Sequence, residues 1–363
     1  MNRRTFIAST STALLASGCT VERGMKSKEN SSTGSNRKVT LKLATSWPAH
    51  FPIMGTVLER FAERVKQASN NTLIINIYPK NSLIPALAVF DAASTGQIDA
   101  FHSGPYYWKG KNSAFSLFSG LPFGTTEGEL NAWMHYGDGL KLWREMYAKY
   151  NLYPFLGGNT SNQMGGWYRK PIESIEDLQG LKMRIPGLGG EVMAKLGVNP
   201  ILLPAGEIFT ALERGTIDAT EWVGPALDKR MGFSKVASYY YSGWHEPGST
   251  IELTFNKQSF EKLSVSHKAI IEAASAEMNA HMTYEFQAEN AKALQELKSQ
   301  GIEFRTFNRP IIDAAKIALK EVLAELSEKN SDFEKVLKNY LAFSKTNAEW
   351  TKLGLQNYLE FRS

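Results

Sequence analysis

The chain has 363 residues, of which 43% are hydrophobic and 21% charged, a composition typical of globular proteins and a length sufficient for two lobes. The formal net charge of +5 arises from residues 1–38, which contain seven Lys or Arg side chains and two Glu side chains. The remainder has 34 basic and 34 acidic side chains and no net charge. A neutral body gives no reason to expect nucleic-acid binding.

The first 19 residues predict an export signal. Arg3 and Arg4 form the twin-arginine start of a bacterial export signal, and residues 7–15 form an apolar segment too short to span a bilayer. No later segment approaches the 18 consecutive apolar residues of a membrane span. We therefore expect a protein of the periplasm.

The end of this signal predicts a lipid anchor. Residues 16–19 resemble a lipoprotein cleavage box, although Ala16 stands where such a box more often has Leu. We expect lipid attachment at Cys19, and the alternative is a plain signal peptide that is cut nearby. Cys19 is the only cysteine, so no disulfide is expected. Residues 20–38, rich in Ser, Asn, Gly and Lys, predict a flexible tether.

The body of the chain begins with alternating strands and helices. The hydrophobic pattern predicts strands at residues 39–44, 72–78 and 98–101, and helices at 54–68 and 85–95. The second helix is expected to begin at Pro85, because proline is favoured in the first helical position. The order β-α-β-α-β predicts a mostly parallel sheet with helices on both faces.

Shorter elements follow, and then long helices. Helices are predicted at 126–150, 175–178, 187–196 and 209–214, and strands at 151–157, 165–169, 181–185, 217–219 and 249–256. From about residue 266 the chain is almost entirely helical, with helices at 266–299, 309–329 and onward to 362. At about 1.5 Å per residue these helices are longer than one lobe. We expect them to brace both lobes or to contact a partner subunit.

A repeated segment divides the body into two halves. Residues 90–100 and 209–219 share six identical residues at a constant offset of 119. The repeat predicts two similar lobes that face each other, and the alternative is convergent use of one helix–turn–strand pattern. In this alignment Glu221 matches His102. We therefore expect both residues at strand ends facing a cleft, where open α/β sheets bind their ligands.

These elements predict an α/β fold with two lobes. We expect lobe I to contain residues 39–158 together with about 242–275, which return to it. Lobe II is expected over residues 159–241, and bracing and C-terminal helices over 276–363.

The sequence lacks common catalytic signatures. It contains no Gly-x-Ser-x-Gly, no Gly-x-x-x-x-Gly-Lys and no His-Glu-x-x-His, and its six histidines lack the spacing of a zinc site. We therefore do not expect an enzyme. Polar side chains in segments rich in glycine and aromatic residues indicate a binding site instead, and these are Gln163, Arg184, Glu221 and Glu246.

Arg184 and Glu221 are the main candidates among these residues. A guanidinium group matches a carboxylate with two parallel hydrogen bonds, so Arg184 is a candidate carboxylate-binding residue. The alternative for Arg184 is an exposed ion pair worth roughly 0–1 kcal/mol. Glu221 follows a predicted strand and precedes Trp222. The alternative for this pair is a surface glutamate beside a core tryptophan.

Four motifs resemble the DctP-like family, the periplasmic solute-binding subunits of tripartite ATP-independent periplasmic (TRAP) transporters. The motifs are residues 180–190, 203–212, 217–225 and 239–248, and the resemblance extends over about 39–307. It is strongest to the branch that binds 2-oxo or 2-hydroxy monocarboxylates such as pyruvate and lactate. The resemblance implies a two-lobed, type II-like periplasmic-binding-protein fold with a cleft, extra C-terminal helices, and delivery of the ligand to a TRAP membrane permease.

The resemblance also implies roles for individual residues. Arg184 takes the place of the arginine that pairs with the ligand carboxylate. A cation bound with the ligand would be held by the Gln163 side chain, the Glu221 carboxylate and the Trp222 backbone carbonyl, with Glu246 near the ligand. Such hard oxygen donors suit Na⁺ or Ca²⁺.

The charges at this implied site bear on the identity of the ion. Arg184, Glu221 and a monocarboxylate sum to −1, which Na⁺ neutralises, whereas an ionised Glu246 makes the sum −2, which Ca²⁺ neutralises. The sequence leaves both ions open.

Aromatic residues are expected to form the cleft wall. Trp47, Trp222 and the run Tyr106-Tyr107-Trp108 are the candidates, and we assign Trp47 and Tyr107 to the ligand. Core packing is the alternative for each of these aromatic residues.

The function predicted from the sequence is therefore a receptor for a small carboxylate. One alternative is a periplasmic hydrolase or lyase that uses Glu221 and Glu246 as an acid/base pair, and another is a sensor subunit that docks onto a signalling protein. The length of the C-terminal helices and the habits of the family branch also imply a homodimer through these helices.

Overall fold

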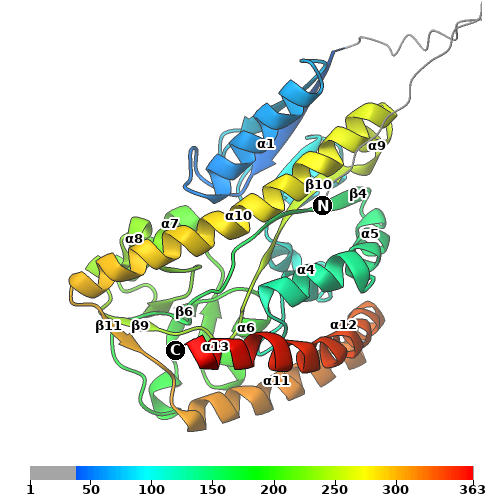
Figure 1. Cartoon of the computed structure of the whole chain (residues 1–363). Coiled ribbons are helices and arrows are strands. Elements are labelled where there is room, and N and C mark those ends of the chain that lie inside the picture. The colour runs from blue at the N-terminus through cyan, green and yellow to red at the C-terminus, as the bar shows by residue number, and fades with distance from the viewer. Residues whose placement is uncertain (1–37, 363) are drawn as a thin grey trace, which may run out of the picture. The chain divides into compact units, whose positions relative to one another are not determined.

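The computed structural model describes residues 38–362 (Figure 1). The predicted export signal, Cys19 and the predicted tether up to residue 37 lie outside the described residues. Among the helices of residues 38–362, none combines the length and apolar character required to cross a membrane.

Eleven strands are described. They are β1 (Val39–Thr45), β2 (Leu73–Tyr78), β3 (Ala100–Ser103), β4 (Leu152–Asn159), β5 (Gly166–Tyr168), β6 (Lys182–Arg184), β7 (Asn199–Ile201), β8 (Ala219–Thr220), β9 (Tyr239–Tyr241), β10 (Thr250–Asn256) and β11 (Glu303–Arg305).

The α-helices of the described chain become long after residue 264. They are α1 (Met54–Ala68), α2 (Val89–Ser94), α3 (Phe115–Ser119), α4 (Glu127–Tyr136), α5 (Gly139–Ala148), α6 (Gly187–Lys195), α7 (Ala205–Glu213), α8 (Pro225–Met231), α9 (Lys257–Glu261), α10 (Val265–Ser299), α11 (Arg309–Lys329), α12 (Ser331–Thr351) and α13 (Asn357–Arg362). Three 3₁₀ turns, η1 (Pro105–Trp108), η2 (Glu176–Leu178) and η3 (Phe233–Lys235), and a π-helical turn, η4 (Lys352–Gln356), complete the set.

The strands form two mixed sheets. The first has the order β2-β1-β3-β10-β4, in which β1 is parallel to β2 and β3, and β10 is antiparallel to both neighbours. The second has the order β11-β9-β5-β8-β6-β7, with β5 antiparallel to β8 and β9. The parallel arrangement predicted for the first three strands is confirmed, but the sheet as a whole is mixed, because β10 enters it in the opposite direction.

The repeat predicted from the sequence has the same local structure in both sheets. The backbone N–H of Lys42 in β1 donates to the Asp99 carboxylate at 2.8 Å, and the N–H of Lys182 in β6 donates to the Asp218 carboxylate at 3.0 Å. Asp99 directly precedes β3, which is parallel to β1. Asp218 directly precedes β8, which is parallel to β6. The two halves thus use one helix–turn–strand arrangement twice.

Helix α10 contacts elements of both sheets. It packs against α1 and β4 beside the first sheet and against α8 beside the second (Figure 1). Gly158 of β4 has a φ of 147°, and a Cβ there would lie 2.2 Å from the Met282 sulfur of α10. Only glycine therefore allows this close contact between strand and helix.

Side-chain caps define where the long C-terminal helices begin. Ser264, Asn308 and Asn330 each accept a hydrogen bond from a backbone N–H in the first turn of α10, α11 and α12, respectively. The predicted range 309–329 agrees with α11, and 266–299 differs from α10 by one residue.

Some predicted boundaries are wrong. Helix α2 begins at Val89 because residues from Pro85 to Ala88 form a turn, in which the Ala88 N–H donates to the Pro85 carbonyl at 2.9 Å. The single helix predicted at 126–150 is two helices, α4 and α5, because Asp138 between them has a left-handed φ of 69°. The strand predicted at 217–219 is the shorter β8, displaced toward Glu221.

Glu252 of β10 is a completely buried carboxyl group in the first sheet. It accepts hydrogen bonds from the Trp108 indole N–H and the Thr254 hydroxyl, both at 2.6 Å. Burial raises the pKa of Glu252 to about 7, because removal of a carboxylate from water disfavours the charged form.

We predict that replacing Glu252 with Gln makes the free energy of unfolding less dependent on pH. A carboxyl group with a raised folded-state pKa is protonated more readily in the folded chain, so its contribution is favourable below about pH 4.5 and is lost as the pH rises to about 7. The loss is on the order of 3 kcal/mol. Denaturant unfolding of both proteins between pH 4 and 8 measures it. An identical slope for the two proteins would contradict the prediction.

Candidate functional site

The polar residues singled out in the sequence converge at the carboxyl ends of β6 and β8. Arg184 ends β6 and pairs in register with Thr220, which ends β8 and precedes Glu221. Gln163 lies in the loop between β4 and β5, and Glu246 lies in the loop between β9 and β10. The parallel pairing of β6 with β8 thus places a guanidinium and a carboxylate side by side.

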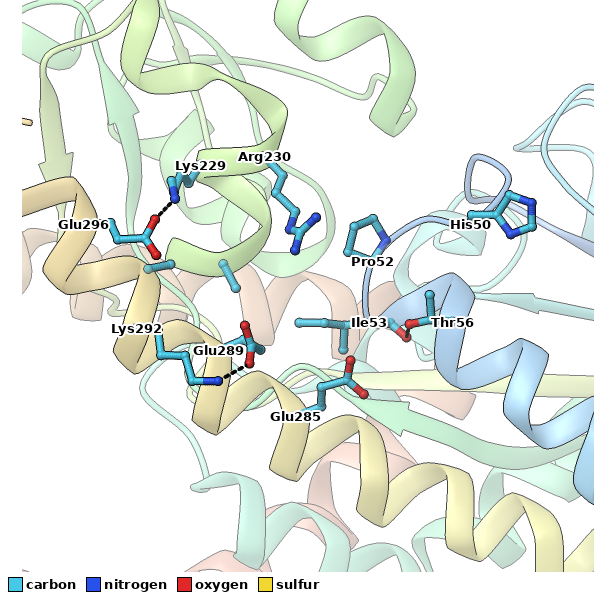
Figure 2. Close-up of a pocket in the computed structure, with 12 residues that line it drawn as sticks. His50, Pro52, Ile53, Thr56, Lys229, Arg230, Glu285, Glu289, Lys292 and Glu296 are labelled. Atoms are coloured by element: carbon cyan, nitrogen blue, oxygen red, sulfur yellow. Dashed lines mark hydrogen bonds and ion pairs between the residues drawn. The ribbon is translucent and has the colours of Figure 1, made fainter.

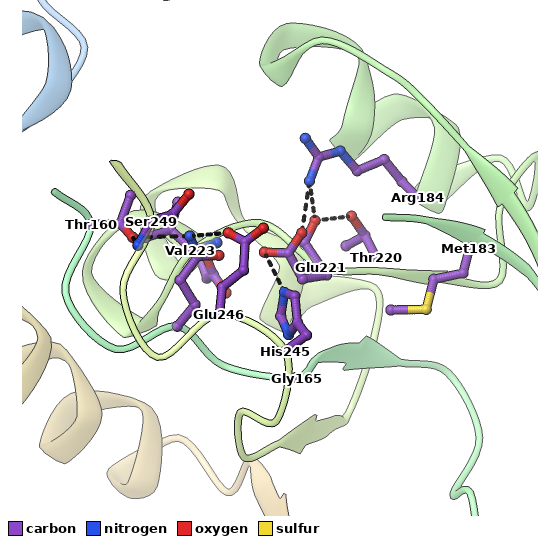
Figure 3. Close-up of polar contacts among 12 residues, drawn as sticks. Thr160, Gly165, Met183, Arg184, Thr220, Glu221, Val223, His245, Glu246 and Ser249 are labelled. Carbon is purple, nitrogen blue, oxygen red and sulfur yellow. Dashed lines mark hydrogen bonds and ion pairs between the residues drawn. The ribbon is translucent and has the colours of Figure 1, made fainter. Parts of the chain in front are cut away.

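Arg184 and Glu221 form a buried ion pair. The Arg184 Nη1 donates to the Glu221 backbone carbonyl at 2.7 Å and to Oε2 of its carboxylate at 3.0 Å (Figure 3). Each residue is 1% exposed. The alternatives of an exposed ion pair for Arg184 and a surface position for Glu221 are therefore excluded.

The other donors of Arg184 reach both sides of the site. Its Nε donates to the Leu203 carbonyl at 3.3 Å, and its Nη2 donates to the Tyr107 hydroxyl at 3.4 Å. The Arg184 guanidinium carbon lies 4.8 Å from the centre of the Trp222 ring, within the range of a cation–π contact. The Nη2 atom makes the longest of these hydrogen bonds, so it is the donor most readily available to a ligand.

Gln163 and Glu246 are joined by a hydrogen bond. The Gln163 Nε2 donates to the Glu246 carboxylate and to the Thr160 hydroxyl, both at 2.9 Å. This arrangement fixes which end of the Gln163 amide is the oxygen. Burial raises the pKa of Glu246 to about 7 despite the opposing influence of His245.

Two buried oxygens of this cluster have no hydrogen-bond partner among residues 38–362. They are Oε1 of Gln163 and Oε1 of Glu221. A buried polar atom left unpaired costs about 1–3 kcal/mol, so each requires an explanation. An amide oxygen and a carboxylate oxygen are hard donors, and they fit Na⁺ or Ca²⁺.

The described chain offers no site of the zinc type. Within residues 38–362 no group of three or more His, Cys, Asp or Glu side chains is arranged so that it could hold a metal ion. The donors that fit a cation here are instead one carboxylate and one amide, and the Trp222 backbone carbonyl is the third group that the family resemblance implies.

His245 is a member of the cluster that the sequence analysis did not assign. Its Nε2 lies 3.7 Å from Oε1 of Glu221, on a different side from Arg184 (Figure 3). Burial disfavours the charged imidazole, but the Glu221 and Glu246 carboxylates together outweigh this effect and raise the pKa of His245. Apart from His102, which the repeat matches with Glu221, the histidines showed no spacing typical of a known site. The position of His245 next to Glu246 was the signal that could have identified it.

Aromatic rings from the first sheet meet Trp222 from the second. The Trp222 ring centre lies 6.3 Å from that of Trp47 and 6.4 Å from that of Phe51, and both contacts are edge-to-face. Trp47 also lies 6.5 Å from Tyr107. All of these side chains are at most 9% exposed. The assigned residues Trp47, Tyr107 and Trp222 therefore lie together as one aromatic wall.

Trp47 is held in place by a hydrogen-bonded histidine. Its indole N–H donates to Nδ1 of His102 at 2.8 Å, and Nε2 of His102 lies 2.9 Å from the Gly157 carbonyl. His102 is the residue that the repeat matches with Glu221. It lies within β3, one position before the strand ends.

Trp108 belongs to the core of the first lobe. Its ring packs against Phe90 and Phe101, and its indole N–H is the donor to Glu252. For this residue the core-packing alternative is correct.

A separate surface cleft of about 580 Å³ contains none of the assigned residues. It lies between the loop around Pro52, helix α8 and helix α10 (Figure 2). Its lysines 229 and 292 are paired with Glu296 and Glu289, respectively. This pairing leaves the cleft with the character of a solvated surface.

Comparison with known proteins gives a family match over most of the chain. The family model "DctP: Bacterial extracellular solute-binding protein, family 7" matches residues 43–330. A monocarboxylate 2-oxoacid-binding periplasmic protein of Nostoc sp. is 38% identical over 328 residues, which cover 90% of this chain and 89% of the relative.

Two solved structures are similar over nearly their full length. A TRAP periplasmic solute-binding protein of Colwellia psychrerythraea, with bound calcium and pyruvate, is 42% identical with a TM-score of 0.88. One of Pseudoalteromonas atlantica, with bound sodium and pyruvate, is 43% identical, also with a TM-score of 0.88. Each comparison covers 89% of this chain and 99% of the solved chain.

We predict that replacing Gln163 with Leu weakens binding of Ca²⁺. The substitution removes the unpaired Oε1 while keeping a side chain of similar size, and we expect roughly tenfold or greater loss of affinity. Calcium titration followed by tryptophan fluorescence measures the effect. Gln179→Leu is the matched control, because Gln179 donates to the Leu196 carbonyl away from the cluster. Equal affinities for the two variants would contradict the prediction.

Proposed function

Since this chain belongs to the DctP family of bacterial extracellular solute-binding proteins, we propose that it binds a small 2-oxo or 2-hydroxy monocarboxylate together with Na⁺ or Ca²⁺. The protein is a transport receptor of the TRAP type and acts in the periplasm. Related receptors were crystallised with pyruvate and either calcium or sodium.

The observation that carries this proposal is a pair of buried oxygens without a hydrogen-bond partner among residues 38–362, close to a buried arginine. Oε1 of Gln163 and Oε1 of Glu221 would accept a cation, and Arg184, which pairs with Glu221, would supply the positive charge for a carboxylate. A cation bound there would supply positive charge between the protein oxygens and the oxygens of the acid. These groups distinguish a small organic anion from a neutral solute.

The remaining residues have the roles of positioning the ligand and excluding water. Nη2 of Arg184 would bind the carboxylate, and Tyr107 would reach it from the other lobe. Trp47 and Trp222 would cover the short carbon chain, since their rings already meet across the lobes. Glu246 holds the Gln163 amide in the orientation that leaves Oε1 free.

A receptor of this kind delivers its ligand to a membrane permease. We propose that the twin-arginine signal exports the protein and that lipid attached to Cys19 tethers it near the membrane. The TRAP character of the related receptors supports a permease of that type as the partner.

The enzyme alternative has no support among the relatives. The chain's family and its close relatives are receptors for transport and not hydrolases or lyases. Glu221 is also committed to Arg184 through a 3.0 Å ion pair, which is unfavourable for an acid/base residue that must exchange protons.

We predict that pyruvate with Na⁺ or Ca²⁺ raises the melting temperature of the wild-type protein and leaves that of Arg184→Ala unchanged. A ligand at about a hundredfold excess over Kd stabilises by about 2.7 kcal/mol. Glu221→Gln should retain a smaller response, because a neutral amide is a weaker cation ligand than a carboxylate. Thermal-shift assays with pyruvate, lactate and a dicarboxylate, with and without chelator, measure the responses.

Arg305→Ala is the control, because Arg305 pairs with Glu303 and Glu173 at the surface. An unchanged response to pyruvate in Arg184→Ala would overturn the site assignment. Pyruvate recovered in altered form after incubation would instead favour an enzyme.

We also propose that the C-terminal helices form a homodimer. The last turns of α12, η4 and α13 expose large apolar side chains, with Trp350 72%, Leu353 71% and Phe361 87% exposed. Several large exposed apolar side chains on neighbouring helical turns are characteristic of a protein–protein contact. The partner that we propose is the same helices of a second copy of the chain. The length of these helices supports this choice, because they are longer than one lobe requires.

We predict a dimeric mass for the wild-type protein and a monomeric mass for the double variant Trp350→Glu, Leu353→Glu. Charged groups at both positions would have to be buried unpaired in the contact. Size-exclusion chromatography with light scattering measures the mass. Tyr136→Glu, at a 90% exposed aromatic residue of α4, is the control and should remain dimeric. A monomeric wild-type protein would refute the proposal.

A further inference from the structure

Asp228 is a buried carboxylate beside the candidate site that has no assigned role. It lies in the first turn of α8 and is 0% exposed. None of the Lys, Arg or His side chains within residues 38–362 forms an ion pair with it. A carboxylate without a cation partner is costly to bury, and three hydrogen bonds offset this cost for Asp228.

The hydrogen bonds of Asp228 come from three different segments. Oδ2 accepts from the Trp167 indole N–H of β5 at 3.1 Å and from the Tyr240 hydroxyl of β9 at 2.8 Å. Oδ1 accepts from the backbone N–H of Val223 at 3.2 Å. Trp167 and Tyr240 are stacked, with ring centres 4.0 Å apart and planes at 14°. The stacked rings thus fix the carboxylate, and the carboxylate fixes the backbone at Val223.

The bond to Val223 determines the direction of the preceding carbonyl. The Val223 N–H and the Trp222 C=O belong to one planar, trans peptide unit, in which the two groups point in opposite directions. With the N–H directed at the buried carboxylate, the Trp222 carbonyl must point away from it. The carbonyl on the other side of Val223 accepts from the Met164 N–H at 2.8 Å, which brings the turn next to Gln163.

We propose that Asp228 is a positioning residue for the cation site, and that it aims the Trp222 carbonyl by holding the Val223 N–H. This inference rests on the proposed function, in which Trp222 supplies a backbone oxygen. Asp228 does not touch the cation. Its role is to fix one peptide plane before the cation binds, so that the carbonyl does not have to be reoriented.

The test uses Asp228→Asn and the luminescent ion Tb³⁺ as a replacement for Ca²⁺. An Asn side chain cannot accept from all three donors, because one of its two polar atoms is itself an N–H donor. We expect at least about tenfold weaker Tb³⁺ binding, the scale seen when a supporting group of a metal site is removed. Luminescence lifetimes in H₂O and D₂O count the water molecules on Tb³⁺, and we expect one more than in the wild-type protein, because water replaces the carbonyl.

Glu252→Gln is the matched control. Glu252 is a second completely buried carboxyl group bonded to an indole N–H and a hydroxyl, and burial raises its pKa, like that of Asp228, to about 7. It belongs to the first sheet and holds no part of the Trp222 turn. Loss of affinity in both variants, or an unchanged number of bound waters in Asp228→Asn, would reduce Asp228 to a structural residue and overturn the inference.

The proposed function and the inference fail in different ways. A wild-type protein that binds neither Tb³⁺ nor Ca²⁺ in the presence of pyruvate refutes the cation site itself. A wild-type protein that binds them, beside an Asp228→Asn variant with equal affinity and hydration, refutes only the role of Asp228.

Tyr240→Phe is the variant to use if Asp228→Asn does not fold. It removes one of the two donors to Oδ2 but keeps the carboxylate and the aromatic ring. We expect a smaller loss of affinity, of about threefold, with the additional water partly populated. Wild-type affinity and hydration in this variant would count against the inference.

Discussion

The buried pairing of Arg184 with Glu221 is the interaction on which the candidate site depends. Isolated, either charge would be too costly to remove from water, and together they are held at the ends of two parallel strands. The pair leaves one carboxylate oxygen and one end of the guanidinium for other partners. A protein that binds an acid together with a cation requires both groups at one place. The guanidinium would face the carboxylate of the acid, and the carboxylate oxygen would face the cation.

The fold provides this place through two lobes of related construction. The same backbone-to-aspartate hydrogen bond recurs at Asp99 and Asp218, and the strand that follows each aspartate leads to a residue of the site, His102 or Glu221. One lobe supplies Trp47 and Tyr107, and the other supplies Trp222 together with the charged pair Arg184 and Glu221. Helix α10 contacts elements of both lobes, so a continuous helix limits their separation.

The sequence predicts best what is determined by neighbouring residues. Helix α11 was predicted at its observed bounds, because its cap at Asn308 and its apolar spacing are local signals. The helix expected at Pro85 fails for the converse reason, since the residues after Pro85 form a turn that periodicity does not reveal. The mixed direction of the sheets also depends on contacts between segments far apart in the chain.

The same distinction applies to the site. The pattern of polar residues in glycine- and aromatic-rich segments identified Arg184, Gln163, Glu221 and Glu246, and the family resemblance gave them roles. The structure brings these residues together, but neither signal indicated that Arg184 and Glu221 would pair directly. Asp228 was not identified, because its partners lie at distances in sequence that no local motif encodes. For Asp228, the donor Tyr240 is 12 residues away and the donor Trp167 is 61 residues away.

The hydrogen bonds of His102 have a consequence for the aromatic wall. Because Nδ1 of His102 accepts a hydrogen bond from the Trp47 indole N–H, the imidazole must carry its proton on Nε2, which donates to the Gly157 carbonyl. This single tautomer suits a neutral ring, and burial lowers the pKa of His102 to about 4. A protein outside the cytoplasm is exposed to the acidity of its surroundings. The orientation of Trp47 should therefore persist through mild acidification, since the imidazole that holds it remains uncharged.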